Sequence, residues 1–306
     1  MAPQDLTTTQ WLKALLEPGY ILASAMSYYI QANISAILSG RILAPVLSYQ
    51  ALRDEAFGRF WVAFSSNREE PPPQDTQPLT GSGSGFGADV KEVQASSDLI
   101  PPILAQASGV VLDVGPGTGT QMPLLKSPAI KAIYGAEPCK GLHPELRKRA
   151  NDEGLGDKYT ILPCSVVRKE LEGELEKVGV RPDGAGDGGV FDTIITVRVL
   201  CSVPDFENTV VELYSLLKPG GKMLVVEHVV NPWKTAKGSI LARVMQGIYH
   251  LCGWRWVMGD CCLNRDTEGV LRKVAQGDGG WESADVERWF ERTCMVYVAG
   301  TFVKRG

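Results

Sequence analysis

The chain has 306 residues, of which 44% are hydrophobic, and its formal net charge is −4. This length and composition fit one large α/β domain with an appendage and exclude a disordered chain. No run of five or more basic residues occurs, so we expect no nucleic-acid partner and favour a small-molecule substrate.

The cysteine and histidine content argues against a metal centre. The chain has seven cysteines and three histidines, and no cysteine pair has C-x-x-C spacing. We therefore expect reduced thiols in an intracellular compartment, either the cytoplasm or the cytoplasmic face of an internal membrane. The adjacent Cys261 and Cys262 have no partners at ligand spacing, so no metal site is predicted.

Residues 1–66 are expected to form a helical extension. Residues 18–40 carry no charge, and they fit either an amphipathic lid over the catalytic domain or a helix that enters or lies on a membrane. Asp5 and Glu17 precede this stretch, which disfavours a secretion signal. Farther along, apolar residues at helical spacing predict core packing. These residues are Leu52, Ala56, Phe60 and Phe64.

Two further segments complete the predicted organisation. Residues 67–90 are rich in proline, glycine and serine, which is typical of a linker. Residues 91–306 are expected to form the catalytic domain.

The catalytic domain opens with an apolar strand, residues 110–114, that leads into a loop with three glycines at alternate positions. Gly115, Gly117 and Gly119 permit positive φ angles and a close approach of backbone to a ligand, and a helix after the loop would direct N–H groups at an anion. A dinucleotide fingerprint needs another glycine where this chain has Thr120. The spacing therefore favours S-adenosylmethionine over NAD.

Alternating strands and helices follow this loop. Residues 131–137 predict a second strand that ends in Glu137, where an acid binds ribose hydroxyls. Residues 191–197 and 222–228 are apolar strands typical of a parallel sheet, the latter after a Pro-Gly-Gly turn. Residues 239–256 predict one amphipathic helix, and residues 281–286 and 294–303 predict two last strands, the final one antiparallel.

The order of these blocks resembles the class I S-adenosylmethionine-dependent methyltransferases. Three short segments narrow this resemblance to the methyltransferase-like branch that contains the animal alkyl-thiol methyltransferases and fungal enzymes. They are residues 199–203 (Val-Leu-Cys-Ser-Val), 227–229 (Glu-His-Val) and 261–267 (Cys-Cys-Leu-Asn-Arg-Asp-Thr). The resemblance runs from about Ala51 to the last residue. It implies a Rossmann-like α/β fold with a mostly parallel seven-stranded sheet and helices on both faces. Animal members carry a hydrophobic N-terminal anchor, which supports the membrane alternative.

The resemblance also implies a cofactor site. Asp113 would hold the glycine loop and the cofactor's amino group, or else cap the turn, and Glu137 would bind the ribose or else be a surface acid. The usual adenine-contacting acid is missing after the third strand, so Ser165 or backbone would replace it. The residues expected to bind S-adenosylmethionine are Asp113, Gly115, Gly117, Gly119, Glu137, Ser165, Arg198 and Val199.

On the acceptor side, His228 ends a core strand at the ligand-binding edge and is the candidate proton acceptor, unless it only bonds a neighbouring helix. Cys201 is expected to be a packing residue, and residues 264–266 a structural turn or a substrate contact. The predicted activity is methyl transfer to an O, S or N atom of a small, fairly apolar metabolite. The alternatives are a catalytically silent accessory protein of a biosynthetic pathway and, less favoured, an NAD-dependent oxidoreductase; the oligomeric state stays open.

Overall fold

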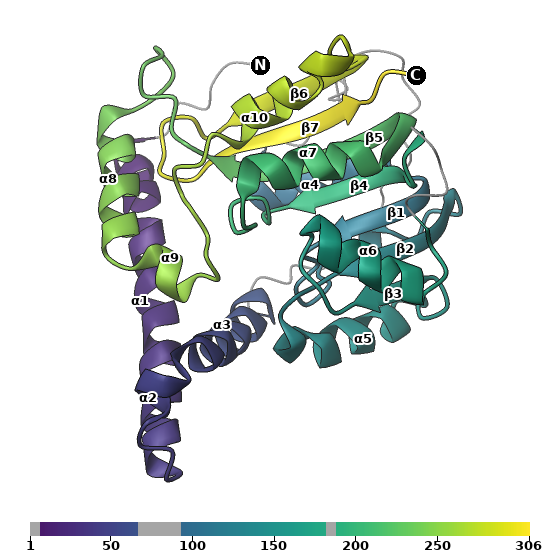
Figure 1. Ribbon diagram of the computed structural model, residues 1–306. Coiled ribbons are helices and arrows are strands. Elements are labelled where there is room, and N and C mark those ends of the chain that lie inside the picture. Colours follow the sequence, from purple (N-terminus) through teal and green to yellow (C-terminus); the bar gives the residue numbers. More distant parts are fainter. Residues whose placement is uncertain (1–6, 67–92, 182–187) are drawn as a thin grey trace.

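The computed structural model describes residues 7–66, 93–181 and 188–306, so the predicted linker lies outside the described residues. The central element is one seven-stranded sheet, drawn in Figure 1. Its strands are β1 (Gly109–Val114), β2 (Ile130–Ala136), β3 (Tyr159–Leu162), β4 (Phe191–Val197), β5 (Leu217–Val229), β6 (Ser283–Trp289) and β7 (Val296–Val303).

The strand order is β3-β2-β1-β4-β5-β7-β6. β1 to β5 run parallel, whereas β7 pairs antiparallel with both β5 and β6. The order reverses at β1, and open α/β sheets bind ligands at such a switch point, beyond the carboxyl ends of the strands. The predicted mostly parallel Rossmann-like sheet with an antiparallel last strand is confirmed.

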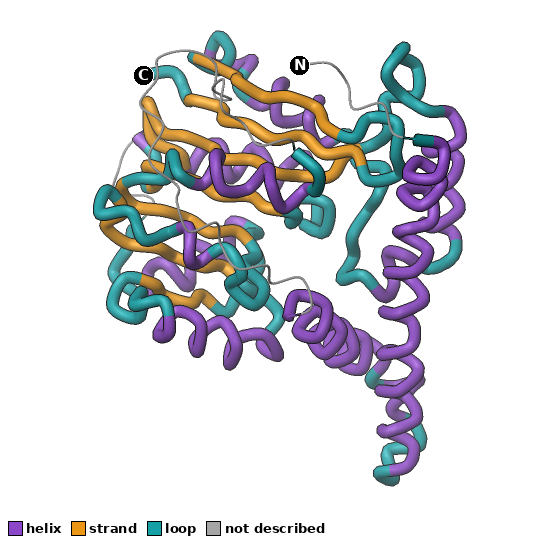
Figure 2. The backbone as a smooth tube through the Cα atoms, turned by 180° about the vertical axis from the view of Figure 1, so that it is seen from behind, coloured by secondary structure: helices purple, strands orange, loops and turns teal. Residues whose placement is uncertain are grey.

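Helices cover both faces of the sheet because its central strands are apolar on both sides. Ile194 of β4 packs in a core with α6, α7 and α10, whereas its neighbour Ile195 packs in a second core with α4 and α5. Figures 1 and 2 show the two faces. The covering helices are α4 (Ile100–Leu104), α5 (His143–Asp152), α6 (Arg168–Lys177), α7 (Phe206–Leu216) and α10 (Thr267–Val274).

The N-terminal extension is helical, as expected. It comprises α1 (Thr8–Leu38), α2 (Ala44–Leu47) and α3 (Tyr49–Ser66). Leu52, Ala56 and Phe60 are buried, which confirms their packing role. Phe64 is half-buried, and its ring stacks on that of Phe60 with centroids 5.2 Å apart. In Figure 1, α1 is the long helix at the edge of the molecule, and α3 slants from it toward the sheet.

The prediction of a helix directly after the glycine loop is wrong. The chain forms only a short 3-10 helix, η2 (Met122–Leu124), before β2 begins. Pro123 and Pro128 lie in this segment, and proline disrupts a helix interior. The loop's anion-facing donors must therefore come from the loop itself.

The predicted helix over residues 239–256 is interrupted. It consists of α8 (Ile240–Leu251) and α9 (Trp254–Val257), separated at Gly253, which has φ +96°. The apolar stripe of α8 faces outward with exposed fractions of 43–86%, whereas Ala242, Gln246 and Tyr249 face the protein. The outward residues are Leu241, Val244, Ile248 and Leu251.

Two strand boundaries also differ from expectation. β5 already begins at Leu217 and includes the Pro-Gly-Gly segment, where the register with β4 is irregular. β6 begins two residues later than predicted and extends to Trp289, because its full length pairs with β7.

Candidate active site

The three loop glycines all adopt the left-handed conformation that favours glycine. Their φ angles are +57° at Gly115, +61° at Gly117 and +76° at Gly119. A Cβ at Gly115 would collide with Val199, and one at Gly117 would lie 2.8 Å from Nε1 of Trp61. The loop therefore requires glycine for both conformation and space, which is the property of a backbone cradle.

Glu137 lies beneath this cradle and organises it. Its carboxylate accepts hydrogen bonds from the backbone N–H of Gly117 (2.9 Å) and of Cys139 (2.8 Å). The side chain is buried, and burial raises its pKa above the ordinary value. The alternative of a surface acid is therefore wrong; a carboxylate held at this edge is suited to accept bonds from the hydroxyls of a ribose.

Asp113 does not cap the turn. It is buried near the end of β1, and its Oδ2 accepts a 2.8 Å hydrogen bond from the hydroxyl of Tyr159 on β3. The tyrosine passes over Gly135 of the intervening β2, where a Cβ would collide with the ring. Burial raises the pKa of Asp113 to about 6. The carboxyl is thus fixed in place by a residue far along the chain.

Helix α3 packs directly on the glycine loop. Besides the contact of Trp61 with Gly117, the hydroxyl of Thr118 donates a 3.0 Å hydrogen bond to Oγ of Ser65, and both of these residues are buried. Trp61 also stacks on Phe57, with ring centroids 5.8 Å apart. An aromatic helix face therefore borders the predicted cofactor position.

The carboxyl end of β4 is constrained by an acid on β5. Arg198 adopts φ +57°, which is strained for a residue with a side chain. Directly after it, the N–H groups of Val199 and Leu200 both donate to Oε1 of Glu227 at 3.0 Å. Glu227 is fully buried, and burial raises its pKa to about 7. This acid fixes the backbone that borders the loop at Gly115.

Ser165 lies in the turn between β3 and α6. It is half-buried, its N–H donates to Glu170 at 3.1 Å, and its hydroxyl accepts a long bond from the N–H of Val167 at 3.4 Å. Its place after β3 fits the expected adenine side of the site, and its role there stays a prediction.

His228 follows Glu227 at the end of β5 and is buried together with two thiols. Its Nε2 lies 3.2 Å from Sγ of Cys261. Cys201 lies beside both, so that one ligand atom from each of the three residues falls within 4.8 Å of the others. The neighbours of this imidazole are thus sulfur atoms, and no bond from it to a helix is among its described contacts.

The block over residues 261–267 serves to join the strand-end loops. Arg265 donates to the carbonyls of Leu200 (2.6 Å) and Val203 (3.0 Å), and the N–H of Cys262 donates to the carbonyl of Cys201 (2.9 Å). Asp266 caps α10. Both side chains thus have the structural roles that the sequence left open.

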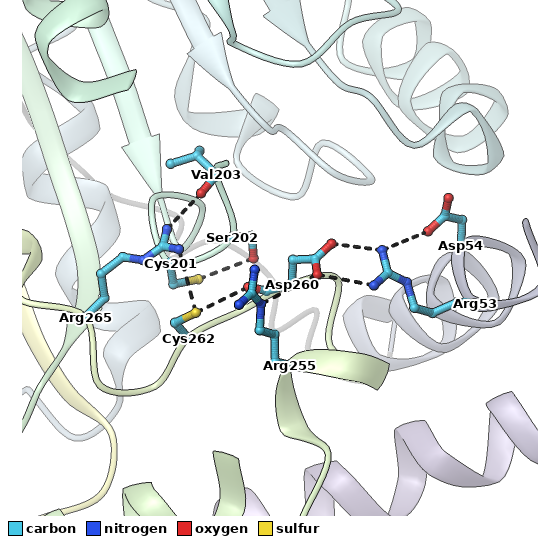
Figure 3. A network of polar contacts seen from close by, with 9 residues as sticks. All are labelled: Arg53, Asp54, Cys201, Ser202, Val203, Arg255, Asp260, Cys262 and Arg265. Atoms are coloured by element: carbon cyan, nitrogen blue, oxygen red, sulfur yellow. Dashed lines mark hydrogen bonds and ion pairs between the residues drawn. The ribbon is translucent and has the colours of Figure 1, made fainter. Parts of the chain in front are cut away.

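A polar network links α3 to the same loops, as Figure 3 shows. Arg53 of α3 forms a bidentate pair with Asp260, with N···O distances of 3.2 and 2.8 Å. Asp260 has φ +63° and precedes the two cysteines. The N-terminal extension is therefore attached to both halves of the site, the glycine loop and the loop after α9.

Three of these residues were missed by the sequence argument. Tyr159 and Trp61 contact the site only through tertiary packing, and Glu227 was read as part of an apolar strand. The sequence contains a signal for two of them. For Tyr159 the signal is Gly135, because a glycine inside a strand marks a position that a large side chain crosses. An acid within a core strand, such as Glu227, marks a functional or anchoring carboxylate.

Comparison with known proteins agrees with this geometry. Residues 91–256, just over half of the chain, match the family model described as a methyltransferase domain. A demethylmenaquinone methyltransferase from Thermus thermophilus is 28% identical over 169 residues, which are 55% of this chain and 67% of that protein. A human thiol S-methyltransferase is 33% identical over 79 residues, 26% of this chain and 30% of that protein.

A solved structure shows the same fold. An O-methyltransferase family protein from Burkholderia thailandensis superposes with a TM-score of 0.51 at 13% identity, and the match covers 98% of this chain and 74% of that one. The family match, this shared fold and the glycine cradle agree. The chain belongs to the class I methyltransferases, and its cofactor is S-adenosylmethionine.

Proposed function

We propose that this chain transfers the methyl group of S-adenosylmethionine to an oxygen, sulfur or nitrogen atom of a small, fairly apolar metabolite, in secondary metabolism. The observation that carries the proposal is the hydrogen bond between the carboxylate of Glu137 and the N–H of Gly117. It joins the acid that we propose binds the ribose to the loop that we propose faces the methionine end of the cofactor.

The apolar character of the acceptor is inferred from the side chains near the sheet edge. Phe57 and Trp61 of α3 belong to the same cluster as Cys201 and Met258. This cluster lies where the loops after β4 and α9 meet, and ligand sites are predominantly lined by apolar side chains with a few polar groups. A small molecule with an apolar body and one nucleophilic atom fits such a lining.

The cofactor supplies an activated methyl carbon, so the protein mainly has to position the two reactants. Correct placement is worth about 7–11 kcal/mol of the barrier, whereas a positioned acid or base contributes about 10²- to 10⁴-fold in rate. The fixed backbone at Val199, anchored by Glu227, serves the first task. His228 is the residue we propose to act on the acceptor.

The choice of acceptor atom follows from the name of one relative. The human relative's name specifies a thiol acceptor, and the match to it covers 26% of this chain. This favours sulfur among the three atoms.

The direct test supplies methyl-labelled S-adenosylmethionine and a small-molecule cell extract to the purified chain. We expect a metabolite to gain the mass of one labelled methyl group in the presence of the wild-type chain and not with Gly117→Val. Tight cofactor binding without any labelled metabolite would favour the accessory-protein alternative, and no cofactor binding would remove both.

We further propose that the chain is intracellular and associates with a membrane through α1 and α8. Helix α1 has the length and mean hydropathy of a spanning helix, and 28% of its most apolar window is buried. Its exposed residues include Ile34 and Leu38, and α8 beside it carries an outward apolar stripe. Two adjacent apolar helix faces are suited to the interface of a lipid bilayer.

Deleting α1 would expose the core around Leu15, which is buried, so point substitutions are the better test. We expect Ile34→Glu with Leu38→Glu to abolish sedimentation with phosphatidylcholine vesicles. Val211→Glu, at an exposed position on α7, is the matched control and should sediment like wild type. Absence of vesicle binding by the wild-type chain would leave the lid interpretation.

A further inference from the structure

The buried group formed by Cys201, His228 and Cys261 has the composition of a metal site. The three side chains are 2%, 4% and 6% exposed, respectively. Their nitrogen and sulfur ligand atoms all lie within 4.8 Å of one another, and Nε2 of His228 lies 3.2 Å from Sγ of Cys261. Thiolate and imidazole are the donors that Zn²⁺ prefers in proteins.

The ligands come from three separate segments that other contacts hold together. Cys201 follows β4, His228 ends β5 and Cys261 follows α9. The N–H of Cys262 bonds the carbonyl of Cys201, and Arg265 bonds the carbonyl just before it, that of Leu200. These bonds fix the backbone that carries the two thiols, and both cysteines are free. A site preorganised in this way loses little entropy when an ion binds.

We propose that Cys201, His228 and Cys261 bind one soft divalent ion, with Zn²⁺ the best match, and leave a fourth coordination position open. A tetrahedral zinc ion with bonds of about 2.0–2.3 Å holds its ligands about 3.4–3.8 Å apart. The observed separations require a movement of about 1 Å at most to reach this geometry. Three protein ligands with an open position are characteristic of catalytic zinc, whereas structural zinc is closed by four.

The charge of the site also favours an ion. Two thiolates and a neutral imidazole balance the charge of Zn²⁺, so the filled site is neutral. A single buried thiolate, in contrast, would carry an uncompensated charge, which is costly in an apolar interior.

The site adjoins the predicted position of the methyl group. Sγ of Cys201 lies 3.8 Å from the carbonyl of Arg198, the residue whose neighbour Val199 packs against Gly115 of the glycine loop. A ligand at the open position would therefore be close to the cofactor's edge of the sheet. This assignment departs from the expected absence of a metal and makes His228 a ligand in place of a proton acceptor. Metal binding does not depend on the proposed methyl transfer; only its use in that reaction does.

The experiment measures Zn²⁺ binding by the purified full-length chain, after removal of metal with a chelator and under reducing conditions. We expect one tightly bound ion per chain. Loss of an outer-shell partner typically lowers metal affinity about 10- to 100-fold, so loss of a ligand in Cys201→Ser or Cys261→Ser should cost at least about 100-fold. Cys262→Ser is the matched control, since it removes the adjacent thiol from outside the group, and should bind like wild type.

A second measurement guards against variants that do not fold. Co²⁺ added to the wild-type chain should give the intense charge-transfer absorption of a two-thiolate site, and Zn²⁺ should displace it. No bound ion in the wild-type chain would overturn the proposal, as would Cys201→Ser and Cys261→Ser with wild-type affinity. A disulfide between Cys201 and Cys261 in the metal-free, unreduced chain, together with no metal binding by the reduced chain, would also overturn it. Methyl transfer by a chain without metal would overturn only its use in the reaction.

Discussion

The two halves of the site are built in different ways. The cofactor half uses backbone and short-range sequence: a strand, three glycines and an acid twenty residues later, with Gly117 bonded to Glu137. The acceptor half assembles side chains from β4, β5 and the loop after α9, and α3 closes over both. Cofactor binding therefore depends on local spacing, whereas acceptor chemistry depends on tertiary contacts.

The largest effect is expected from Gly117→Val. The φ of +61° and the close approach of Trp61 leave no room for a branched side chain, and we expect cofactor binding to be abolished in calorimetry. Gly154→Val is the control, because Gly154 has φ +71° and nothing within 4 Å. Both variants bear the left-handed strain of about 1–2 kcal/mol. A folded Gly117→Val whose affinity is within about threefold of wild type, or ~0.7 kcal/mol, would show that the loop is misassigned.

On the acceptor half, His228→Ala should lower turnover by about 10²- to 10⁴-fold, the range for a positioned acid or base, if His228 accepts the proton of the acceptor. If His228 instead holds the proposed ion, its loss should lower turnover through the loss of that ion. Cofactor affinity should stay nearly unchanged, because His228 contacts Cys261 and not the glycine loop. Steady-state kinetics with an acceptor found in the extract, together with calorimetry, measure the two quantities. His250→Ala, on α8, should leave both unchanged. An equal loss in both variants would remove His228 from the reaction.

Asp113 gives a prediction in the pH dependence of stability. Its pKa is raised from 3.8 to about 6 by burial in the folded chain, so the folded state holds the proton more tightly than the unfolded state. The resulting stabilisation is complete below about pH 4 and is lost as the pH rises through about 6, a change of up to about 3 kcal/mol.

Asp113→Asn should remove this dependence. The cofactor-free variant should be more stable than wild type at pH 7 in urea unfolding, by up to about 3 kcal/mol, and should bind the cofactor more weakly. Tyr159→Phe removes the donor that lowers the pKa of Asp113, so it should move the transition to higher pH. Parallel stability profiles for wild type and Asp113→Asn would contradict this account of the buried carboxyl.

Among the four substitutions at Gly117, His228, Asp113 and Glu137, we expect the smallest effect from Glu137→Ala. It should weaken cofactor binding by about 1.5–3 kcal/mol, the range for hydrogen bonds to a charged group. Glu153→Ala is the control, since it removes a carboxylate that pairs with Lys126. An unchanged dissociation constant for Glu137→Ala would mean that another residue holds the ribose.

The sequence predicted the sheet and the glycine loop beside Glu137, because apolar strands, glycines and a strand-end acid are local patterns. It failed where the decisive contact is long-range: Tyr159 reaches Asp113 across an intervening strand, and no spacing rule connects Cys201 with Cys261. It also expected a helix after the loop, where the prolines permit only η2. The pattern of the glycine loop predicted that helix, and the prolines that follow the loop prevented it.

The most direct test of the separation between the cofactor half and the acceptor half uses two variants, Glu137→Ala and His228→Ala. Cofactor affinity and turnover at saturating cofactor are measured in both. We expect Glu137→Ala to weaken S-adenosylmethionine binding and to leave turnover at saturation near wild type. We expect the reverse for His228→Ala, and additive effects in the double variant. If either substitution changes both quantities to a similar degree, the two halves do not act separately and the account is wrong.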